Sequence, residues 1–257
     1  MNPIIKFENI SVSFNDYPVL ENITFSIDEK DFFVIMGPNG GGKTTLLKVL
    51  LGLTKPEKGQ VTILSKEQRI SHLIGYVPQF SSSDREFPIN VWDTVLLGRL
   101  GKKGLFQRFN DDDHKKTGQA LQKVGMQDFK NKQIGLLSEG QRQRVFVARA
   151  LASDPEILIL DEPTASIDKQ MSNNIYELLN ELKKQITIIL VTHDLGTVSG
   201  YVTKLACLNR KLYFHNSKEL DNKDFEEAYG CPFELVAHGV PHRVYKSHAK
   251  GDQDAGI

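Results

Sequence analysis

The stretch FFVIMGPNGGGKTTLLKVLL, residues 32–51, decides the fold. Its first five residues are an apolar run of strand length, and KTTLLKVLL, from Lys43 to Leu51, has the apolar spacing of a helix that ends before Gly52. GPNGGGKTT, residues 37–45, stands between them and fits the pattern G-x-x-x-x-G-K-[ST], which binds phosphate when it joins a strand to a helix. A glycine-rich turn without a ligand is the alternative, and the strand-loop-helix context argues against it.

The residue types of this loop explain why it would hold phosphate. Glycines allow the backbone to fold so that its N–H groups point inward, and the start of the helix adds positive potential. Lys43 can reach the β- and γ-phosphates of a nucleotide, and the Thr44 hydroxyl can bind Mg²⁺. The candidate nucleotide-binding residues of the loop are Gly37, Pro38, Asn39, Gly40, Gly41, Gly42, Lys43, Thr44 and Thr45.

A pair of carboxylates follows a second apolar run in ILILDEP, residues 157–163. The carboxyl ends of buried parallel strands are where α/β proteins place ligands. Asp161 can orient Mg²⁺ through a water molecule, and Glu162 can act as general base on an attacking water. Taken alone, the pair could be a strand end that meets solvent. Together with the loop at 37–45, it predicts a site that hydrolyses a nucleotide.

LSEGQ, residues 137–141, is a predicted helix start that carries no obvious chemistry of its own. Ser138 as N-cap and Gln141 three residues later form a capping-box pair, and apolar residues follow at helical spacing. The segment holds no phosphate-binding lysine, metal ligand or base. Its helix N-terminus can still bind an anion, because the first backbone N–H groups are unpaired and the helix dipole is positive there.

The remaining pattern predicts a single α/β molecule. Short β-rich runs from Ile4 to about Ile63 predict strands around the first helix, and residues 88–150 are mostly helical. EILILDEP and TIILVTHD predict strands of a parallel sheet buried on both faces, divided by a helix. KLACLNRKLYF predicts a hairpin that turns at Asn209-Arg210, and the polar end KGDQDAGI predicts a disordered tail.

Composition disfavours several classes of protein. The 257 residues are 40% hydrophobic and 25% charged, as in a soluble globular protein, and 32 basic residues balance 32 acidic ones. No positive field therefore favours nucleic acid as a partner. Cys207 and Cys231 are too few for a disulfide framework, and we expect inert thiols in a reducing compartment. Because the longest apolar runs are strand-length and the N-terminus lacks signal-peptide features, we expect no membrane span.

The order of these elements resembles that of the ATP-binding cassette (ABC) ATPases. That family has a phosphate loop, a glutamine after a strand, an L-S-G-G-Q helix start, an Asp-Glu strand end and a histidine after a further strand. In this sequence they stand at 37–45, Gln79 in GYVPQ, 137–141, 161–162 and His193 in LVTHD. The resemblance implies a P-loop NTPase of fold class α/β, with an N-terminal antiparallel β subdomain and a helical insert subdomain.

The resemblance also implies how the chain is divided. The cassette would cover residues 1–215, with the helical subdomain at about 85–150. A C-terminal extension would follow at 216–248, and the disordered tail would occupy 249–257.

Two cassettes of this family pack head to tail, so the resemblance implies a homodimer. Ser138 and the Gly140 N–H of one chain, with Gln141 beside them, would close on the γ-phosphate held by the loop of the other chain. Glu139 departs from the family, which most often has glycine there. A carboxylate suits the start of a helix but adds negative charge near a triphosphate. We expect weakened closure at most.

Four further residues take roles from the resemblance. Gln79 would sense Mg²⁺ and water, and His193 would contact the γ-phosphate and hold the attacking water. Alone, either residue would be an ordinary surface group. Phe14 stands where the family stacks an aromatic ring on adenine, with Tyr17 as second candidate and a core strand position as the alternative. Asp168 in ASID would face the other subunit. The implied ligands are ATP and Mg²⁺, the metal being held by Thr44, Gln79 and, through water, Asp161.

Two segments resemble the importer branch of the family. FPINVWDTVLLGRLG, residues 87–101, resembles metal and siderophore importers, and EEAYGCPFELVAHGVPHRV, residues 226–244, resembles the extension of zinc and manganese importer ATPases. The resemblance implies uptake of a divalent metal ion (zinc, manganese or iron) through separate integral membrane permease subunits, supplied by an extracytoplasmic metal-binding protein. The chain would lie in the cytoplasm, peripheral on the inner face of the cell membrane.

Several alternatives stay open at this point. His238, His242 and His248 could sense metal, but Pro241 interrupts the first pair and leaves no helical face, so a structural extension is favoured. A cytosolic ABC-type ATPase of iron–sulfur cluster assembly, without a membrane partner, would share the motifs. A DNA-repair or translation ATPase is disfavoured by the neutral net charge and by the lack of a coiled coil or second cassette.

Overall fold

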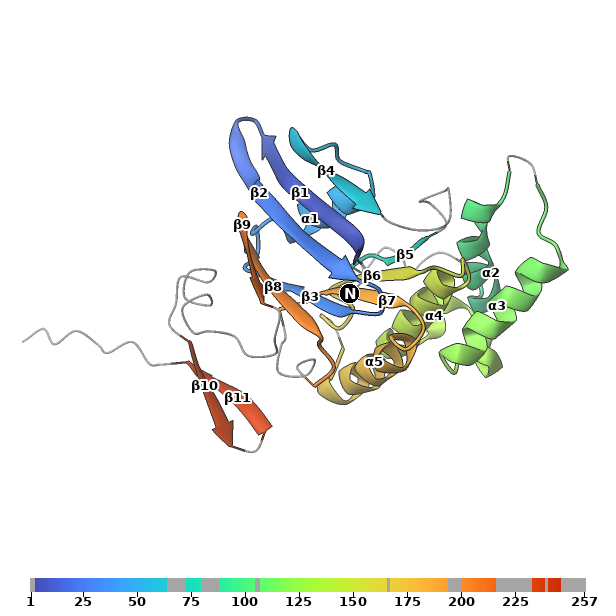
Figure 1. Cartoon of the computed structure of the whole chain (residues 1–257). Helices are drawn as coiled ribbons and strands as arrows, with labels where there is room; N and C mark the ends of the chain where they lie inside the picture. The colour runs from blue at the N-terminus through green and yellow to red at the C-terminus, as the bar shows by residue number, and fades with distance from the viewer. Residues whose placement is uncertain are drawn as a thin grey trace, which may run out of the picture.

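The computed structural model describes residues 3–63, 73–79, 88–104, 107–165, 167–193, 200–215, 233–238 and 240–245. Its centre is a six-stranded sheet in the order β5-β6-β7-β3-β8-β9 (Figure 1). All neighbouring strands are parallel except the last pair. The strands are β3 (Phe32–Met36), β5 (Ile74–Val77), β6 (Ile157–Asp161), β7 (Thr187–Val191), β8 (Lys204–Asn209) and β9 (Lys211–His215).

The predicted burial of this sheet on both faces is confirmed. Every residue of β3, β6 and β7 is buried, as expected for parallel strands covered by helices. The helical segments are α1 (Lys43–Leu50), α2 (Val91–Leu96), η3 (Leu97–Lys102), α3 (Asp111–Lys123), η4 (Gln127–Phe129), η5 (Ile134–Leu136), α4 (Glu139–Leu151) and α5 (Lys169–Leu182).

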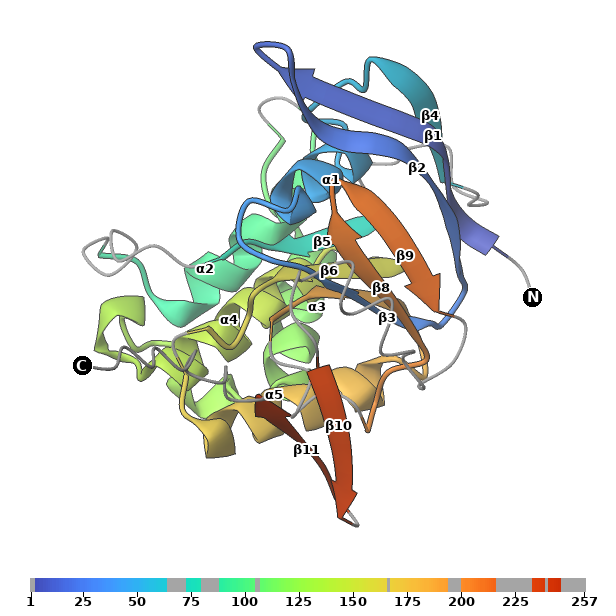
Figure 2. The ribbon, with the colours of Figure 1, turned by 90° about the vertical axis from the view of Figure 1, so that its left-hand side faces the viewer.

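A second, antiparallel sheet forms the N-terminal part of the molecule. Its order is β2-β1-β4, from β1 (Pro3–Phe14), β2 (Tyr17–Asp28) and β4 (Lys58–Ile63). Leu46, Leu47 and Leu50 of α1 pack in one core with the inner side chains of this sheet and with one face of the six-stranded sheet. The helix therefore lies between the two sheets (Figures 1 and 2). It ends one residue before the predicted Leu51.

The other face of the six-stranded sheet is covered by α4, α5 and the helices α2 and α3 of the insert. Residues of all four helices share one hydrophobic core with β3, β6 and β7. Residues 88–150 are mostly helical in their described part, as predicted, and the bounds of a helical subdomain stay a prediction. Among the described residues, no helix is both long and apolar enough to cross a membrane.

The C-terminal strands form two hairpins. β8 and β9 pair antiparallel about Arg210, which has a left-handed φ of 58°, so the predicted turn is confirmed. Cys207 in β8 is buried, and Cys231 lies outside the described residues. β10 (Phe233–His238) and β11 (Val240–Tyr245) form a separate two-stranded sheet, at the end of the molecule away from the β1-β2-β4 sheet (Figures 1 and 2). The predicted tail at 249–257 lies outside the described residues.

Candidate active site

The phosphate loop runs from the end of β3 to the start of α1, at the carboxyl edge of the six-stranded sheet. Gly42 is the N-cap of α1 with φ 97°, and no side chain caps the helix. A Cβ on Gly37 would lie 1.9 Å from the Leu208 carbonyl oxygen, and one on Gly42 would lie 2.8 Å from that of Val19. The neighbouring strands therefore require glycine at both positions, and the first N–H groups of α1 are left to a ligand.

Lys43 is held inside this loop. Its Nζ donates hydrogen bonds of 2.9 Å to the carbonyl oxygens of Gly37 and Pro38, and the residue is buried. Burial lowers the pKa of Lys43, while the nearby charges of Glu162 and Asp161 oppose that shift. Around it, Asn39, Gly40 and Thr44 are exposed, and Pro38, Gly37, Gly41 and Thr45 line the inner side. The loop thus presents an ammonium group and exposed backbone to an incoming phosphate.

The two carboxylates lie at the end of β6. Asp161 is the last residue of the strand and is 5% exposed. Burial and the neighbouring Glu162 raise the pKa of Asp161, and Lys43 opposes them. Glu162 has a left-handed φ of 47° and donates its backbone N–H to the Val191 carbonyl oxygen at 2.9 Å. Such a backbone conformation is uncommon for a non-glycine residue and is typical of functional positions.

Gln79 and His193 meet at the Glu162 side chain, although they come from segments far apart in the sequence. Gln79 Nε2 donates to Glu162 Oε2 at 3.3 Å, and His193 Nδ1 lies 3.6 Å from the same oxygen. Gln79 follows β5 and His193 follows β7, the two neighbours of β6 in the sheet. Since parallel strands end at one edge, their following residues converge there. The structure thus brings together the three residues predicted around the attacking water.

The helix start predicted at LSEGQ is confirmed, including its capping box. Ser138 Oγ accepts from the Gln141 N–H at 3.3 Å, and Gln141 Oε1 accepts from the Ser138 N–H at 3.1 Å. Gly140 is buried, and a Cβ there would lie 2.8 Å from Met171 Sδ in α5. Glu139 lies 3.6 Å from the guanidinium of Arg142, which balances part of its charge. Gly140 therefore packs closely on the flexible Met171 side chain, and Ser138 remains exposed.

Comparison with known proteins identifies the group to which this arrangement belongs. The family model described as ABC transporter matches residues 20–165, more than half of the chain. The chain belongs to the ABC transporter family. This confirms the fold predicted from the order of the motifs, and the protein is an ABC ATPase.

Two curated relatives cover most of the chain. A probable metal transport system ATP-binding protein of Thermotoga maritima is 39% identical over 241 residues, which is 93% of this chain and 95% of the relative. The zinc uptake system ATP-binding protein ZurA of Listeria innocua is 41% identical over 223 residues, 84% of this chain and 87% of the relative.

Two solved structures have the same fold. An inward-facing conformation of a metal-chelate type ABC transporter has a TM-score of 0.85 at 28% identity, covering 96% of this chain and 98% of that chain. A dimeric post-hydrolysis state of the ATP-binding cassette MJ0796, bound to ADP and Pi, has a TM-score of 0.68 at 26% identity. It covers 84% of this chain and 100% of that one.

Two aromatic side chains compete for the adenine-stacking position of this ABC ATPase. Phe14 ends β1 and Tyr17 begins β2, and they pair directly across the turn. Phe14 is 51% exposed and Tyr17 is 77% exposed. The alternative that Phe14 is a core strand residue is therefore wrong. The choice between the two rings for stacking stays a prediction.

The remaining predicted positions lie away from the Glu162 cluster. Asp168 is exposed and is the N-cap of α5, accepting from the Met171 N–H at 2.9 Å. The backbone register of β10 and β11 pairs His238 with Val240 and places His242 two positions further along. Both histidine positions thus share one face of the hairpin. The segment forms strands, so no helical face joins the two histidines, as expected. His248 lies outside the described residues.

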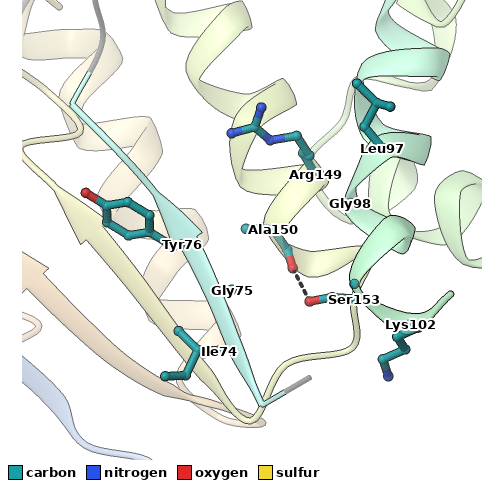
Figure 3. A pocket seen from close by; sticks show the side chains of 10 residues that line it. Ile74, Gly75, Tyr76, Leu97, Gly98, Lys102, Arg149, Ala150 and Ser153 are labelled. Atoms are coloured by element: carbon teal, nitrogen blue, oxygen red, sulfur yellow. Dashed lines mark hydrogen bonds between the residues drawn. The ribbon is translucent and has the colours of Figure 1, made fainter. Parts of the chain in front are cut away.

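A pocket lies between the sheet edge and the helical insert (Figure 3). Edge strand β5 forms one wall, where Gly75 approaches Ala150 of α4 and the Tyr76 ring points to the other face of the sheet. η3 and the last turn of α4 form the opposite wall. Burial and the charge of Asp161 raise the pKa of Tyr76, which shows that the strand leading to Gln79 also borders the carboxylates. The lining residues are Ile74, Gly75, Tyr76, Leu97, Gly98, Gly101, Lys102, Arg149, Ala150 and Ser153.

Proposed function

We propose that this ABC ATPase drives uptake of a divalent metal ion, zinc, manganese or iron, through separate membrane subunits. ATP hydrolysis is supported by the convergence of Gln79 and His193 on one carboxylate oxygen of Glu162. The metal is supported by the names of the relatives, which describe metal and zinc transport systems. Their similarity extends over most of the chain and includes the segment after Gln79.

In the proposed reaction Glu162 accepts a proton from the attacking water. Gln79 and His193 hold this carboxylate and the water between them, and His193 is 60% exposed at its side chain, so it can reach a nucleotide. Lys43, now bonded to loop carbonyls, would turn its ammonium group to the phosphates. General base catalysis by a positioned carboxylate contributes about 10²- to 10⁴-fold to rate.

The donor set fits Mg²⁺. Thr44, Gln79 and Asp161 offer oxygen ligands, which this hard cation prefers. Asp161 is buried, and burial together with the neighbouring Glu162 raises its pKa, while Lys43 opposes the shift. When bound, the metal would neutralise charge on the phosphoryl group being transferred. Thr44 would contact it directly, and Asp161 would hold one of its water ligands.

Two copies of the chain would form the working unit. Ser138 is exposed at the start of α4, where unpaired N–H groups favour an anion. The similar cassette MJ0796 is a dimer with ADP and Pi bound. We therefore assign Ser138, Gly140 and Gln141 to the nucleotide held by the partner's phosphate loop, with Asp168 facing the partner.

The pocket between β5 and η3 is the proposed docking place for a cytoplasmic helix of the membrane subunit. Residues 87–99, within the segment 87–101 that resembles metal and siderophore importers, contribute Leu97 to its rim, and Leu97 and Leu100 are 43% and 52% exposed. Phe87, the first residue of that segment, lies outside the described residues. Exposed apolar side chains beside a pocket are typical of protein interaction sites. A structure similar at TM-score 0.85 belongs to an inward-facing transporter.

The experiment uses the chain together with its membrane permease subunits, reconstituted in vesicles. Wild-type protein should take up radioactive Zn²⁺ or Mn²⁺ only with ATP, and should stay on membranes after a salt wash. Glu162→Gln keeps the side-chain shape and should reduce both hydrolysis and uptake by about 10²-fold or more. Hydrolysis within a few-fold of wild type would remove Glu162 as the base. An ATPase that washes off the membranes and supports no uptake would favour the iron–sulfur assembly alternative.

A further inference from the structure

We propose that Arg99 is a positioning residue that joins η3, α3 and the C-terminal end of α4 into one rigid unit. Through this unit, contacts made at the pocket would reach the helix that begins after Ser138. The inference rests on the proposed docking function. Arg99 has no part in the nucleotide chemistry described above, and its contacts alone suggest the role.

The guanidinium of Arg99 is buried and contacts two neighbouring elements at once. The residue is 5% exposed. Nε donates to Asp113 Oδ1 in α3 at 2.9 Å, and Nη1 donates to the carbonyl oxygen of Ala152, the C-cap of α4, also at 2.9 Å. Asp112 and Asp154 lie at 3.2 and 3.5 Å from the same group. One side chain thus links three segments that are distant in sequence.

Asp113 is the central acceptor of this cluster. It is 1% exposed, and it accepts hydrogen bonds from the Asn110 N–H and forms an ion pair with Lys103 as well as with Arg99. Burial alone would raise the pKa of Asp113, but Lys103, Asn110 and Arg99 together lower it to about 2. The carboxylate therefore stays charged at neutral pH. Loss of one partner would leave a buried charge uncompensated, so the cluster resists separation.

Close backbone packing between η3 and α4 also holds these two elements together. A Cβ on Gly98, next to Arg99 in η3, would lie 2.0 Å from the carbonyl oxygen of Arg149 in the last turn of α4. Such an approach is possible only for glycine. η3 therefore rests directly on α4 and cannot slide over it without breaking the Arg99 hydrogen bonds.

The contacts of Arg99 and Gly98 lie beside the pocket, and two elements lead from the pocket to the active-site residues. One wall of the pocket belongs to β5, which leads to Gln79, and the other belongs to η3 and α4 (Figure 3). α4 has 13 residues and therefore carries a displacement over about 20 Å to its start at Ser138. A helix docked in the pocket would contact β5, which leads to Gln79. It would also contact η3 and the end of α4, the helix whose other end begins at Ser138.

Position 99 requires arginine because the planar guanidinium holds several N–H donors in fixed directions. A lysine could form a point-charge pair with Asp113 but could not donate to Asp113 and Ala152 in opposite directions. Arg99→Lys is therefore the test variant, since it keeps the charge. Lys116→Gln is the matched control: the Lys116–Asp154 pair also joins α3 to the segment after α4, at 3.0 Å, but both side chains are partly exposed. Such surface pairs contribute little.

The first experiment measures rigidity in the full-length chain and needs no membrane partner. Spin labels replace Leu100 in η3 and Leu136 in η5, two residues before the N-cap of α4; these side chains are 52% and 66% exposed. Cys231→Ser removes a second thiol, and the buried Cys207 stays. The wild type should give one narrow distance distribution that ATP does not change. Arg99→Lys should at least double its width, whereas Lys116→Gln should not. A wild-type distance that changes with ATP, or an Arg99→Lys distribution as narrow as wild type, would overturn the proposal.

The second experiment measures transmission in the reconstituted transporter. Arg99→Lys should keep the KM for ATP and the basal kcat of the isolated chain within about three-fold, while the stimulation by loaded binding protein falls to near one-fold. A merely structural defect would lower basal and stimulated rates in the same proportion, and full stimulation would also contradict the role. If the wild-type chain neither assembles with the membrane subunits nor is stimulated by loaded binding protein, the proposed function is wrong. The spin-label experiment still tests the positioning role of Arg99 in that case, because it needs no membrane partner.

Discussion

Glu162 shows at the scale of one residue how the fold prepares a catalytic group. Its left-handed φ of 47° turns the chain sharply after the buried Asp161, and the N–H bond to Val191 holds that turn. The side chain thereby leaves the sheet edge toward Gln79 and His193. A strained backbone position of this kind costs about 1–3 kcal/mol and persists only because its surroundings hold it.

Gln143 shows the opposite case, a buried polar side chain that forms no hydrogen bond within the described residues. It is 1% exposed in α4, and neither its Nε2 nor its Oε1 has a hydrogen-bond partner in the structure described. An unpaired buried amide costs about 1–3 kcal/mol. Gln143→Met should therefore raise the free energy of unfolding in urea by about 1 kcal/mol. Gln122→Met, on the exposed face of α3, is the control and should change it little. A destabilised Gln143→Met would mean that the amide has a partner after all.

The rings of Phe14 and Tyr17 can be separated by nucleotide affinity. If Phe14 stacks on adenine, Phe14→Ala should weaken ATP binding by about 1 kcal/mol, because one aromatic contact is lost. Hydrolysis at saturating ATP should not change. Titration of labelled ATP into each variant measures this directly. Unchanged affinity in Phe14→Ala with a loss in Tyr17→Ala would assign the stacking to Tyr17.

At the scale of elements, α4 carries an unusual charge at its start. Glu139 stands where the family most often has glycine, and Arg142 lies 3.6 Å away. We expect Glu139→Gly to strengthen ATP-driven dimerisation a few-fold, and more at low ionic strength, where screening is weakest. Glu139→Gln removes the charge without adding the backbone freedom of glycine, so it shows which of the two changes acts. Glu181→Gln, at an exposed position of α5, is the control. Dimerisation that weakens in both Glu139 variants would show that the carboxylate supports closure.

Helices and strands could be predicted from the sequence where the local residue pattern matches the burial seen in the structure. The apolar runs of β3, β6 and β7 and the capping box of α4 follow from residue type and spacing. β1 is a less regular strand. It continues to Phe14 past a register shift, where Asn9 has a φ of 51°. A bulge of this kind interrupts the alternation on which strand prediction depends.

At the scale of the whole molecule, what the sequence could predict depended on topology. Gln79, Glu162 and His193 converge because each follows a neighbouring parallel strand, so motif order was sufficient to predict their meeting. The cluster around Arg99 and Asp113 could not be predicted, because it depends on how η3, α3 and α4 pack. The exact walls of the pocket beside β5 arise from the same packing.

The dimer is the central claim, and mixing two defective chains tests it most directly. Lys43→Ala removes the phosphate grip of its own chain, and Ser138→Arg should block the contact made to the partner's nucleotide. Each homodimer then has two defective sites. In a mixed dimer of the head-to-tail kind, both defects fall in one composite site and the other site is intact.

The mixture, with heterodimers isolated by two different tags, should therefore show ATP-dependent dimerisation that neither variant shows alone. Hydrolysis at the single intact site should also exceed that of either variant. If Ser138 served the nucleotide of its own chain, every site in the mixture would lack one group. Isolated heterodimers that neither close on ATP nor hydrolyse it above the separate variants would contradict the account.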